Sequence, residues 1–254
     1  MPDPSPVVTR LRAAGCVFAE DEARLLVAAA TGPAQLAALV DRRVAGEPLE
    51  QVLGWAEFRG LRITVEPGVF VPRRRTELLA RLAESYVGSG STVVDLCCGS
   101  GAVAAALVAA RPGLTPYAVD LDPAAVRCAR RNVPTGHVSA GDLYEPLPAS
   151  LRGRVDVLVA NAPYVPTDEM AMMPPEARDH EPRVALDGGP DGLDVHRRVA
   201  AGAPDWLAPA GRLLIETSAR QAPGTAGAMT RAGLTAEVVA DEELAATVVV
   251  GTRP

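Results

Sequence analysis

The chain has 254 residues, 48% of them hydrophobic and 22% charged, and its formal net charge is −6. This composition is that of an ordinary globular protein and excludes a collagen-like, coiled-coil or wholly disordered chain. The acidic balance argues against a general nucleic-acid binder, because such proteins neutralise phosphates with a basic face. No apolar run approaches the roughly 20 residues of a membrane span, and the N-terminus has no signal-peptide pattern, so we expect a cytoplasmic protein.

The N-terminal part of the chain predicts helices followed by a strand pair. Apolar residues recur at helical spacing over residues 10–46, with a break at 31–33, which indicates two or three short helices. Residues 58–65 then alternate, and a second short run at 69–71 follows a Pro-Gly turn, which is typical of two paired strands. We therefore expect a helical N-terminal domain over residues 1–53 and a β-hairpin linker over 54–72.

From residue 73 onwards, apolar runs alternate with helical stretches, which predicts an α/β domain with a doubly wound parallel sheet. The last two runs are separated by a short acidic turn with no room for a crossover helix, so they should pair antiparallel at an edge of the sheet. We assign residues 73–254 to this domain. The predicted strands are 93–96, 117–120, 155–159, 212–216, 235–240 and 247–250, and the predicted helices are 76–86, 102–111, 123–132, 194–207 and 223–232.

A glycine-containing turn at residues 97–101 follows the first of these strands and opens the next helix. In doubly wound sheets, ligands bind beyond the carboxyl ends of the strands, where glycines let the backbone approach them. Asp120 ends the next strand, 19 residues after Gly101, where an acid can accept both hydroxyls of a ribose. NAD stays possible, but the acidic Asp95 before the turn favours the positively charged S-adenosylmethionine. Asp142, which we expect at the same edge of the sheet, is placed to accept from an adenine amino group.

The segment Asn161-Ala162-Pro163-Tyr164 directly follows the predicted strand at 155–159. Methylation of an amide or amino nitrogen requires acceptors that hold its protons and an aromatic ring that packs on its plane. The Asn161 side chain, the Ala162 carbonyl and the Tyr164 ring supply these parts. An Asx-type turn capped by proline has the same pattern, so these four residues do not decide between the two interpretations.

Taken together, the motifs resemble those of the HemK-type peptide chain release factor N(5)-glutamine methyltransferases. That family carries an N-P-P-Y signature, matched here by residues 161–164, and the resemblance extends over about residues 20–235. Further matches are Gly46-Glu47-Pro48-Leu49, Gly54, Phe58, residues 67–73, Thr76-Glu77, Glu181-Pro182, Ala185-Leu186, Gly188-Gly189, Asp191-Gly192-Leu193, Glu216 and Gln221.

The resemblance implies a Rossmann-like, seven-stranded class I methyltransferase behind a helical domain that recognises the substrate. It implies S-adenosylmethionine as donor, no metal, and a glutamine in the Gly-Gly-Gln loop of a class 1 release factor as acceptor, with neither membrane nor stably bound nucleic acid as partner. By position, it places the acceptor at Asn161, Ala162, Pro163 and Tyr164. It places the cofactor at Asp95, Cys97, Cys98, Gly99, Ser100, Gly101, Asp120, Leu121, Asp142, Leu143 and Asn161.

Two departures from the family pattern keep alternatives open. Ala162 stands where the family has proline, and the family's P-R-P-E-T-E segment reads P-R-R-R-T-E over residues 72–77. The arginines at 73–75 can meet phosphates, so an amino methyltransferase acting on RNA or on a small molecule is one alternative. A catalytically silent nucleoside-binding module is another. The histidines at 137, 180 and 196 form no metal pattern and are expected at the surface, whereas all four cysteines are expected to be buried.

Overall fold

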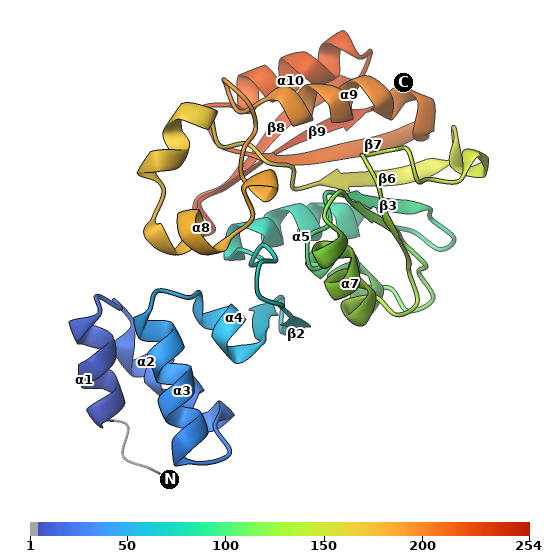
Figure 1. Ribbon diagram of the computed structural model, residues 1–254. Coiled ribbons are helices and arrows are strands. Elements are labelled where there is room, and N and C mark those ends of the chain that lie inside the picture. The colour runs from blue at the N-terminus through green and yellow to red at the C-terminus, as the bar shows by residue number, and fades with distance from the viewer. Residues whose placement is uncertain (1–4) are drawn as a thin grey trace.

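The computed structural model describes residues 5–254 and begins with a small group of helices that lies beside the larger, sheet-containing part of the protein (Figure 1). Two or three helices were predicted between residues 10 and 46, but the described region has a fourth. It forms because Pro48 precedes its first turn and Gly54 ends it in the left-handed conformation (φ 79°). Leu11, Leu26 and Val40 form the shared core of this group. The helices are α1 (Ser5–Ala13), α2 (Ala19–Ala29), α3 (Pro33–Val44) and α4 (Leu49–Leu53).

The strand pair predicted after the helices has a different turn. Strands β1 (Trp55–Phe58) and β2 (Leu61–Thr64) pair antiparallel, so Arg59 and Gly60 make the turn. Both have positive φ, 51° and 74°, as a two-residue hairpin turn requires. The prediction of a strand at residues 69–71 was therefore wrong, because the hairpin is complete before the Pro-Gly turn. Residues 69–71 run as extended chain that packs on the hairpin and on the next domain.

The main sheet has seven strands in the order β5-β4-β3-β6-β7-β9-β8. Its first five members are parallel, and β9 lies antiparallel between β7 and β8, which confirms the predicted antiparallel edge. The chain moves outward in one direction from β3 and in the other from β6, so the strand order reverses between them. The strands are β3 (Val93–Leu96), β4 (Tyr117–Asp120), β5 (His137–Ala140), β6 (Val155–Ala160), β7 (Leu207–Thr217), β8 (Thr235–Asp241) and β9 (Ala246–Thr252).

Helices cover both faces of this sheet, as the alternation of strands and helices predicted (Figure 1). Successive strand residues point to opposite faces, so Val157 and Val159 join one core and Leu158 joins the other. The first face packs against α5 (Glu77–Tyr86), α6 (Ala102–Ala110) and α7 (Pro123–Asn132), and the second packs against α9 (Asp194–Trp206) and α10 (Ala222–Arg231).

Short elements connect β6 to α9. They are the 3-10 turns η3 (Thr167–Met172) and η4 (Arg183–Ala185) and the helix α8 (Pro175–His180). Two further 3-10 turns, η1 (Arg74–Thr76) and η2 (Ala149–Leu151), precede α5 and β6. Within residues 5–254, no helix is long and apolar enough to span a bilayer.

Candidate functional site

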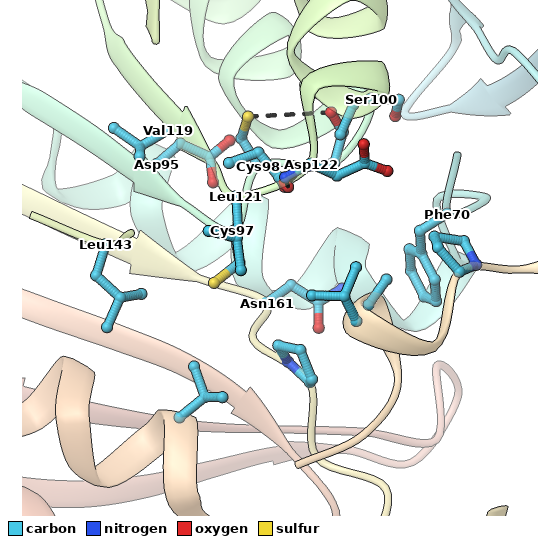
Figure 2. Close-up of a pocket in the computed structure, with 18 of the residues that line it drawn as sticks. Phe70, Asp95, Cys97, Cys98, Ser100, Val119, Leu121, Asp122, Leu143 and Asn161 are labelled. Carbon is cyan, nitrogen blue, oxygen red and sulfur yellow. Dashed lines mark hydrogen bonds between the residues drawn. The ribbon is translucent and has the colours of Figure 1, made fainter. Parts of the chain in front are cut away.

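A cavity lies at the carboxyl ends of β3, β4, β5 and β6, where the strand order reverses (Figure 2). This is the position at which doubly wound sheets bind ligands, because the loops diverge there and leave a crevice. Every residue predicted to hold the cofactor contributes to its wall except Gly101. These are Asp95, Cys97, Cys98, Gly99, Ser100, Asp120, Leu121, Asp142, Leu143 and Asn161.

Two carboxylates, the buried Asp95 and the half-buried Asp120, hold the loops that form one side of the cavity. Asp95 is 2% exposed and accepts from the backbone N–H of Ala104 at 3.2 Å, and burial raises its pKa to about 7. Asp120 accepts from the N–H groups of Gly99 and Asp122, each at 2.8 Å, and burial raises its pKa as well. In the part of the chain that the structure describes, neither carboxylate has a cation beside it that would offset the effect of burial on its pKa. The wall therefore favours a positively charged ligand.

Gly101 acts behind the wall rather than in it. Its φ is 78°, and a Cβ there would lie 3.1 Å from the side chains of Ala129 on α7 and of Val133, which directly follows α7. The residue lets the turn after β3 pack closely on α7. Gly101 was predicted to contact the cofactor, but it does not line the cavity.

Asp142 lies in the wall but has a partner of its own. One carboxylate oxygen is 2.7 Å from Nη2 of Arg198, an α9 residue that also lines the cavity. Arg198 and the apolar Phe70 were not anticipated from the sequence. Both come from segments distant in sequence, so only the folded chain brings them to the strand ends.

The segment 161–164 divides between two sides of the chain. Asn161 and Pro163 line the cavity, whereas Ala162 and Tyr164 do not. Successive side chains of extended backbone point in opposite directions, which explains the division. The prediction that the Tyr164 ring packs on the acceptor therefore has no counterpart in this structure. The Tyr164 hydroxyl instead donates to Glu216 at 3.4 Å, and burial raises its pKa to about 12.

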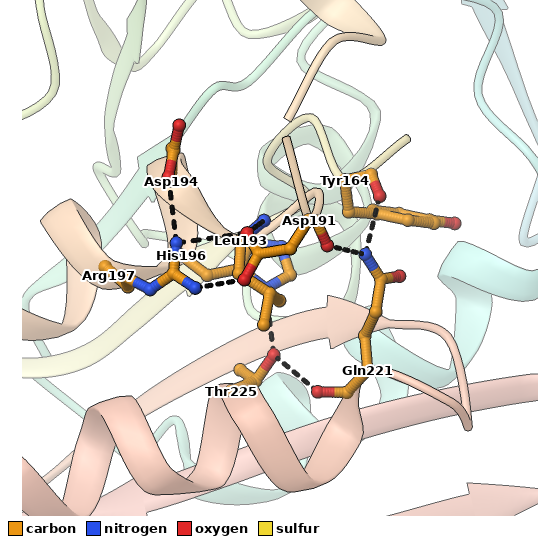
Figure 3. A network of polar contacts seen from close by, with 8 residues as sticks. All are labelled: Tyr164, Asp191, Leu193, Asp194, His196, Arg197, Gln221 and Thr225. Carbon is orange, nitrogen blue, oxygen red and sulfur yellow. Dashed lines mark hydrogen bonds and ion pairs between the residues drawn. The ribbon is translucent and has the colours of Figure 1, made fainter. Parts of the chain in front are cut away.

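A polar network supports the inner side of this segment (Figure 3). Gln221 donates to the carbonyls of Tyr164 at 2.8 Å and of Asp191 at 3.1 Å. His196 is fully buried and shares a 2.9 Å hydrogen bond with Thr225, and burial lowers its pKa to about 4. The predicted surface location of His196 was therefore wrong. Its spacing with the apolar residues 199, 200 and 203 on α9 is the sequence signal that indicates a buried face.

The other two histidines differ from His196. His137 is exposed on β5, and His180 is half-buried beside Gly46, away from the cavity wall. Among residues 5–254, no group of three or more His, Cys, Asp and Glu side chains is arranged to hold a metal ion.

The four cysteines are free thiols. Cys98 and Cys128 are buried as predicted, but Cys16 and Cys97 are only partly so. Cys97 and Cys98 line the cavity, and burial raises the pKa of each thiol well above its ordinary value. They are therefore protonated wall residues and not nucleophiles.

The arginines at 73–75 are not a free basic cluster. Arg73 lies 2.6 Å from Glu181 and Arg75 lies 3.2 Å from Glu216. Within the described chain, Arg74 alone of the three has no ion pair. This pairing removes most of the charge that favoured an RNA acceptor.

Comparison with known proteins agrees with this geometry. The family model for the methyltransferase small domain matches residues 60–173. The chain shares its fold with a methyltransferase from Pyrococcus furiosus, with a TM-score of 0.58 and 15% identity over 87% of this chain and 98% of that one. It also shares it with the 16S rRNA N2 G1207 methyltransferase of T. thermophilus, with a TM-score of 0.54 and 21% identity over 79% of this chain and 50% of that one. The fold and the site thus define a class I methyltransferase.

Sequence relatives narrow this class. The release factor glutamine methyltransferase of Geobacter sulfurreducens is 39% identical over 208 residues, which cover 79% of this chain and 72% of the relative. That of Cereibacter sphaeroides is 38% identical over 253 residues, covering 89% of this chain and 88% of the relative. The chain belongs to the release factor glutamine methyltransferase family.

Proposed function

We propose that this protein transfers a methyl group from S-adenosylmethionine to the side-chain amide nitrogen of a glutamine in a class 1 peptide chain release factor. The observation that carries the proposal is that one cavity has the carboxylates of Asp95 and Asp120 at one side and Asn161 at the other. The names of the relatives support the choice of acceptor. A release factor substrate agrees with the cytoplasmic location expected from the sequence.

The wall fits this cofactor chemically. Asp95 and Asp120 are carboxylates whose pKa values are raised by burial, so a cation beside them restores their charged forms. When bound, S-adenosylmethionine supplies an electrophilic methyl group on a positively charged sulfur. We assign the ribose hydroxyls to Asp120 and the adenine amino group to Asp142, whose Oδ2 also accepts from Arg198. Glycine at position 99 lets the backbone approach the ligand closely.

At the other end, Asn161 holds the acceptor. Its side-chain oxygen accepts a hydrogen bond from the glutamine amide N–H and so directs the nitrogen lone pair along the transfer path. Phe70, Pro72 and Pro163 line this end and exclude water from it. The nitrogen loses its proton after transfer, so the site needs no general base. Positioning of this kind can lower a barrier by about 7–11 kcal/mol.

We further propose that the helical domain over residues 1–53 recognises the release factor, with residues 54–72 as its linker to the methyltransferase domain over 73–254. Val17 and Phe18 are 83% and 69% exposed at the start of α2, which gives this domain an apolar contact for a protein partner.

The experiment incubates the full chain with radiolabelled S-adenosylmethionine and recombinant release factor. Its control is a release factor in which alanine replaces the glutamine of the Gly-Gly-Gln loop. We expect label on the first protein and none on the second. Label on both contradicts the proposed acceptor, and label on neither, with cofactor binding shown by calorimetry, moves the acceptor to other proteins, RNA or small amines.

A further inference from the structure

The turn over residues 73–76 lies between two buried carboxylates. Nη2 of Arg73 is 2.6 Å from Oε2 of Glu181, whose other oxygen accepts from the backbone N–H of Val71 at 3.1 Å. Nε of Arg75 is 3.2 Å from Oε1 of Glu216. The glutamate side chains are 0% and 1% exposed. Both arginines therefore anchor the turn to the protein interior.

Thr76 ends this turn and contacts the proposed acceptor residue. It is 3% exposed, and its Oγ1 lies 3.3 Å from Nδ2 of Asn161. Both residues line the cavity. Burial raises the pKa of the Glu216 carboxyl, and the nearby Thr76 hydroxyl acts against this shift. Thr76 thus contacts Asn161 and lies near Glu216.

The chemistry of these groups gives the connection a direction. A hydroxyl can donate or accept, and an asparagine amide can present either its oxygen or its nitrogen, so the pair alone does not decide which atom faces the cavity. A charged carboxylate can only accept. In the structure the Asn161 nitrogen donates to Thr76 Oγ1 at 3.3 Å, so the Thr76 hydroxyl hydrogen stays available to an acceptor such as the Glu216 carboxylate. The Asn161 oxygen is then free for the cavity.

Two further groups favour the charged, accepting form of Glu216 against the effect of burial. The Arg75 guanidinium and the Tyr164 hydroxyl both approach Oε1, at 3.2 and 3.4 Å. Oε2 is buried and has no hydrogen-bond partner among the described residues, so it remains available to a donor such as the Thr76 hydroxyl. Arg75 also lies over the Tyr164 ring, 5.8 Å from its centroid. Arg75, which departs from the family pattern, thus stabilises the charge on which the direction depends.

We propose that Thr76 is a positioning residue, which fixes the Asn161 amide with its oxygen toward the acceptor glutamine. The Arg73–Glu181 and Arg75–Glu216 pairs hold Thr76 in place. The inference rests on the proposed function, because it is there that Asn161 orients the reacting nitrogen.

The kinetic test compares Thr76→Val, which keeps the shape and removes the hydroxyl, with Thr76→Ser, which restores it. We expect Thr76→Val to lower kcat at least about tenfold and to leave cofactor affinity within about twofold. Thr76→Ser should return kcat to within about threefold of the parent. Thr92→Val is the control, because Thr92 is half-buried at the opposite end of β3.

A spectroscopic test needs no turnover. The sequence has two asparagines, 132 and 161, so selective ¹⁵N labelling of asparagine side chains yields two amide groups. Asn132 donates to the carbonyls of Thr64 and Ser100 at 2.9 and 2.8 Å, and it serves as the internal reference. We expect Thr76→Val to shift the Asn161 signals and to speed the hydrogen exchange of that amide. The Asn161 signals of Thr76→Ser, and the Asn132 signals of both variants, should match those of the parent.

The outcomes separate this inference from the proposed function. If the parent labels the release factor but Thr76→Val keeps kcat and the Asn161 signals, the positioning role is wrong and the function stands. Loss of kcat in both variants with unchanged Asn161 signals also overturns the role. If the parent labels no release factor, the proposed acceptor fails, and the spectra still decide whether Thr76 orients Asn161.

Discussion

Asn161 and Ala162 are adjacent in sequence but face different environments. Asn161 contributes to the cavity wall, whereas Ala162 is 1% exposed and belongs to the core behind it. The small alanine side chain fits this buried position. The departure from the family's proline therefore lies on the inner side of the chain, and Pro163 still restricts the backbone before it to extended conformations.

At the same scale, Asn161→Ala should reduce turnover at least about a hundredfold, because the acceptor nitrogen loses the oxygen that orients it. Cofactor affinity, measured by calorimetry, should change little, since the carboxylates at 95 and 120 are untouched. Turnover near that of the parent would show that Asn161 does not orient the acceptor.

His196 makes stability depend on pH. Its pKa is about 4 in the folded protein and 6.5 ordinarily. Between these pH values the histidine is protonated in the unfolded chain and neutral in the folded protein. Its contribution is complete above pH 6.5 and falls by about 3 kcal/mol on acidification to pH 4. Urea unfolding of the parent and of His196→Gln at several pH values measures this. The stability of the variant relative to the parent should rise as the pH falls.

The comparison between variant and parent is needed because Asp95 titrates in the same range with the opposite sign. Its raised pKa means that the folded chain holds a proton there longer than the unfolded chain does. His137→Gln is the matched control, since it makes the same substitution at an exposed position. A pH-independent difference between His196→Gln and the parent would refute the buried neutral histidine.

At the scale of elements, the turn after β3 is positioned by its contact with α7. Gly101 has a φ of 78° and a Cβ there would lie only 3.1 Å from its neighbours, whereas Gly90 has a φ of 77° and nothing within 4 Å of that position. The two glycines therefore separate backbone strain from packing. The close contact at Gly101 is what brings the wall residues 97–100 to their place over β4.

We expect Gly90→Ala to lower the free energy of unfolding by about 1–2 kcal/mol, the cost of a left-handed alanine. Gly101→Ala should cost about 1–3 kcal/mol more, because α7 must move. Urea unfolding of both variants measures the difference, and only Gly101→Ala should also weaken cofactor binding. Equal losses of unfolding free energy for the two substitutions would mean that the close contact at Gly101 does not contribute to stability.

At the scale of the molecule, Arg43 ties the N-terminal helices to the rest of the chain. This α3 residue is 8% exposed and pairs with Glu22 of α2 at 2.7 Å and with Glu176 of α8 at 3.3 Å. Gln51 of α4 adds a 3.1 Å hydrogen bond to the carbonyl of Val69. The N-terminal helices are therefore attached both to the chain at Val69 and to α8.

Arg43→Leu should lower the free energy of unfolding by about 3–5 kcal/mol, since it leaves Glu22 buried without a partner. The double variant with Glu22→Leu should recover most of this loss. Arg10→Leu is the control, because the Arg10–Asp41 pair is exposed and should cost at most about 1 kcal/mol. The three are compared by urea unfolding, and a double variant as unstable as Arg43→Leu would argue against this cause.

Much of the architecture could be predicted from local patterns. Apolar runs and helical spacing place the strands and helices of the main domain, because burial on both faces demands them. The glycine turn and Asp120 are separated by one strand–helix unit, so their meeting at the cavity follows from the topology. The hairpin turn was misplaced, since Pro67-Gly68 is a strong turn signal that competes with the positive-φ pair at 59–60.

By itself, the sequence determined the fold class, the cavity edge and the family, because these depend on periodicity and on motifs that are contiguous in the chain. Only the tertiary structure decided the partners of the polar side chains. The pairing of Arg75 with Glu216 and the contact of Thr76 with Asn161 join residues 141 and 85 positions apart. Such contacts depend on how the elements pack and on which face each residue points to, and local patterns carry no record of either.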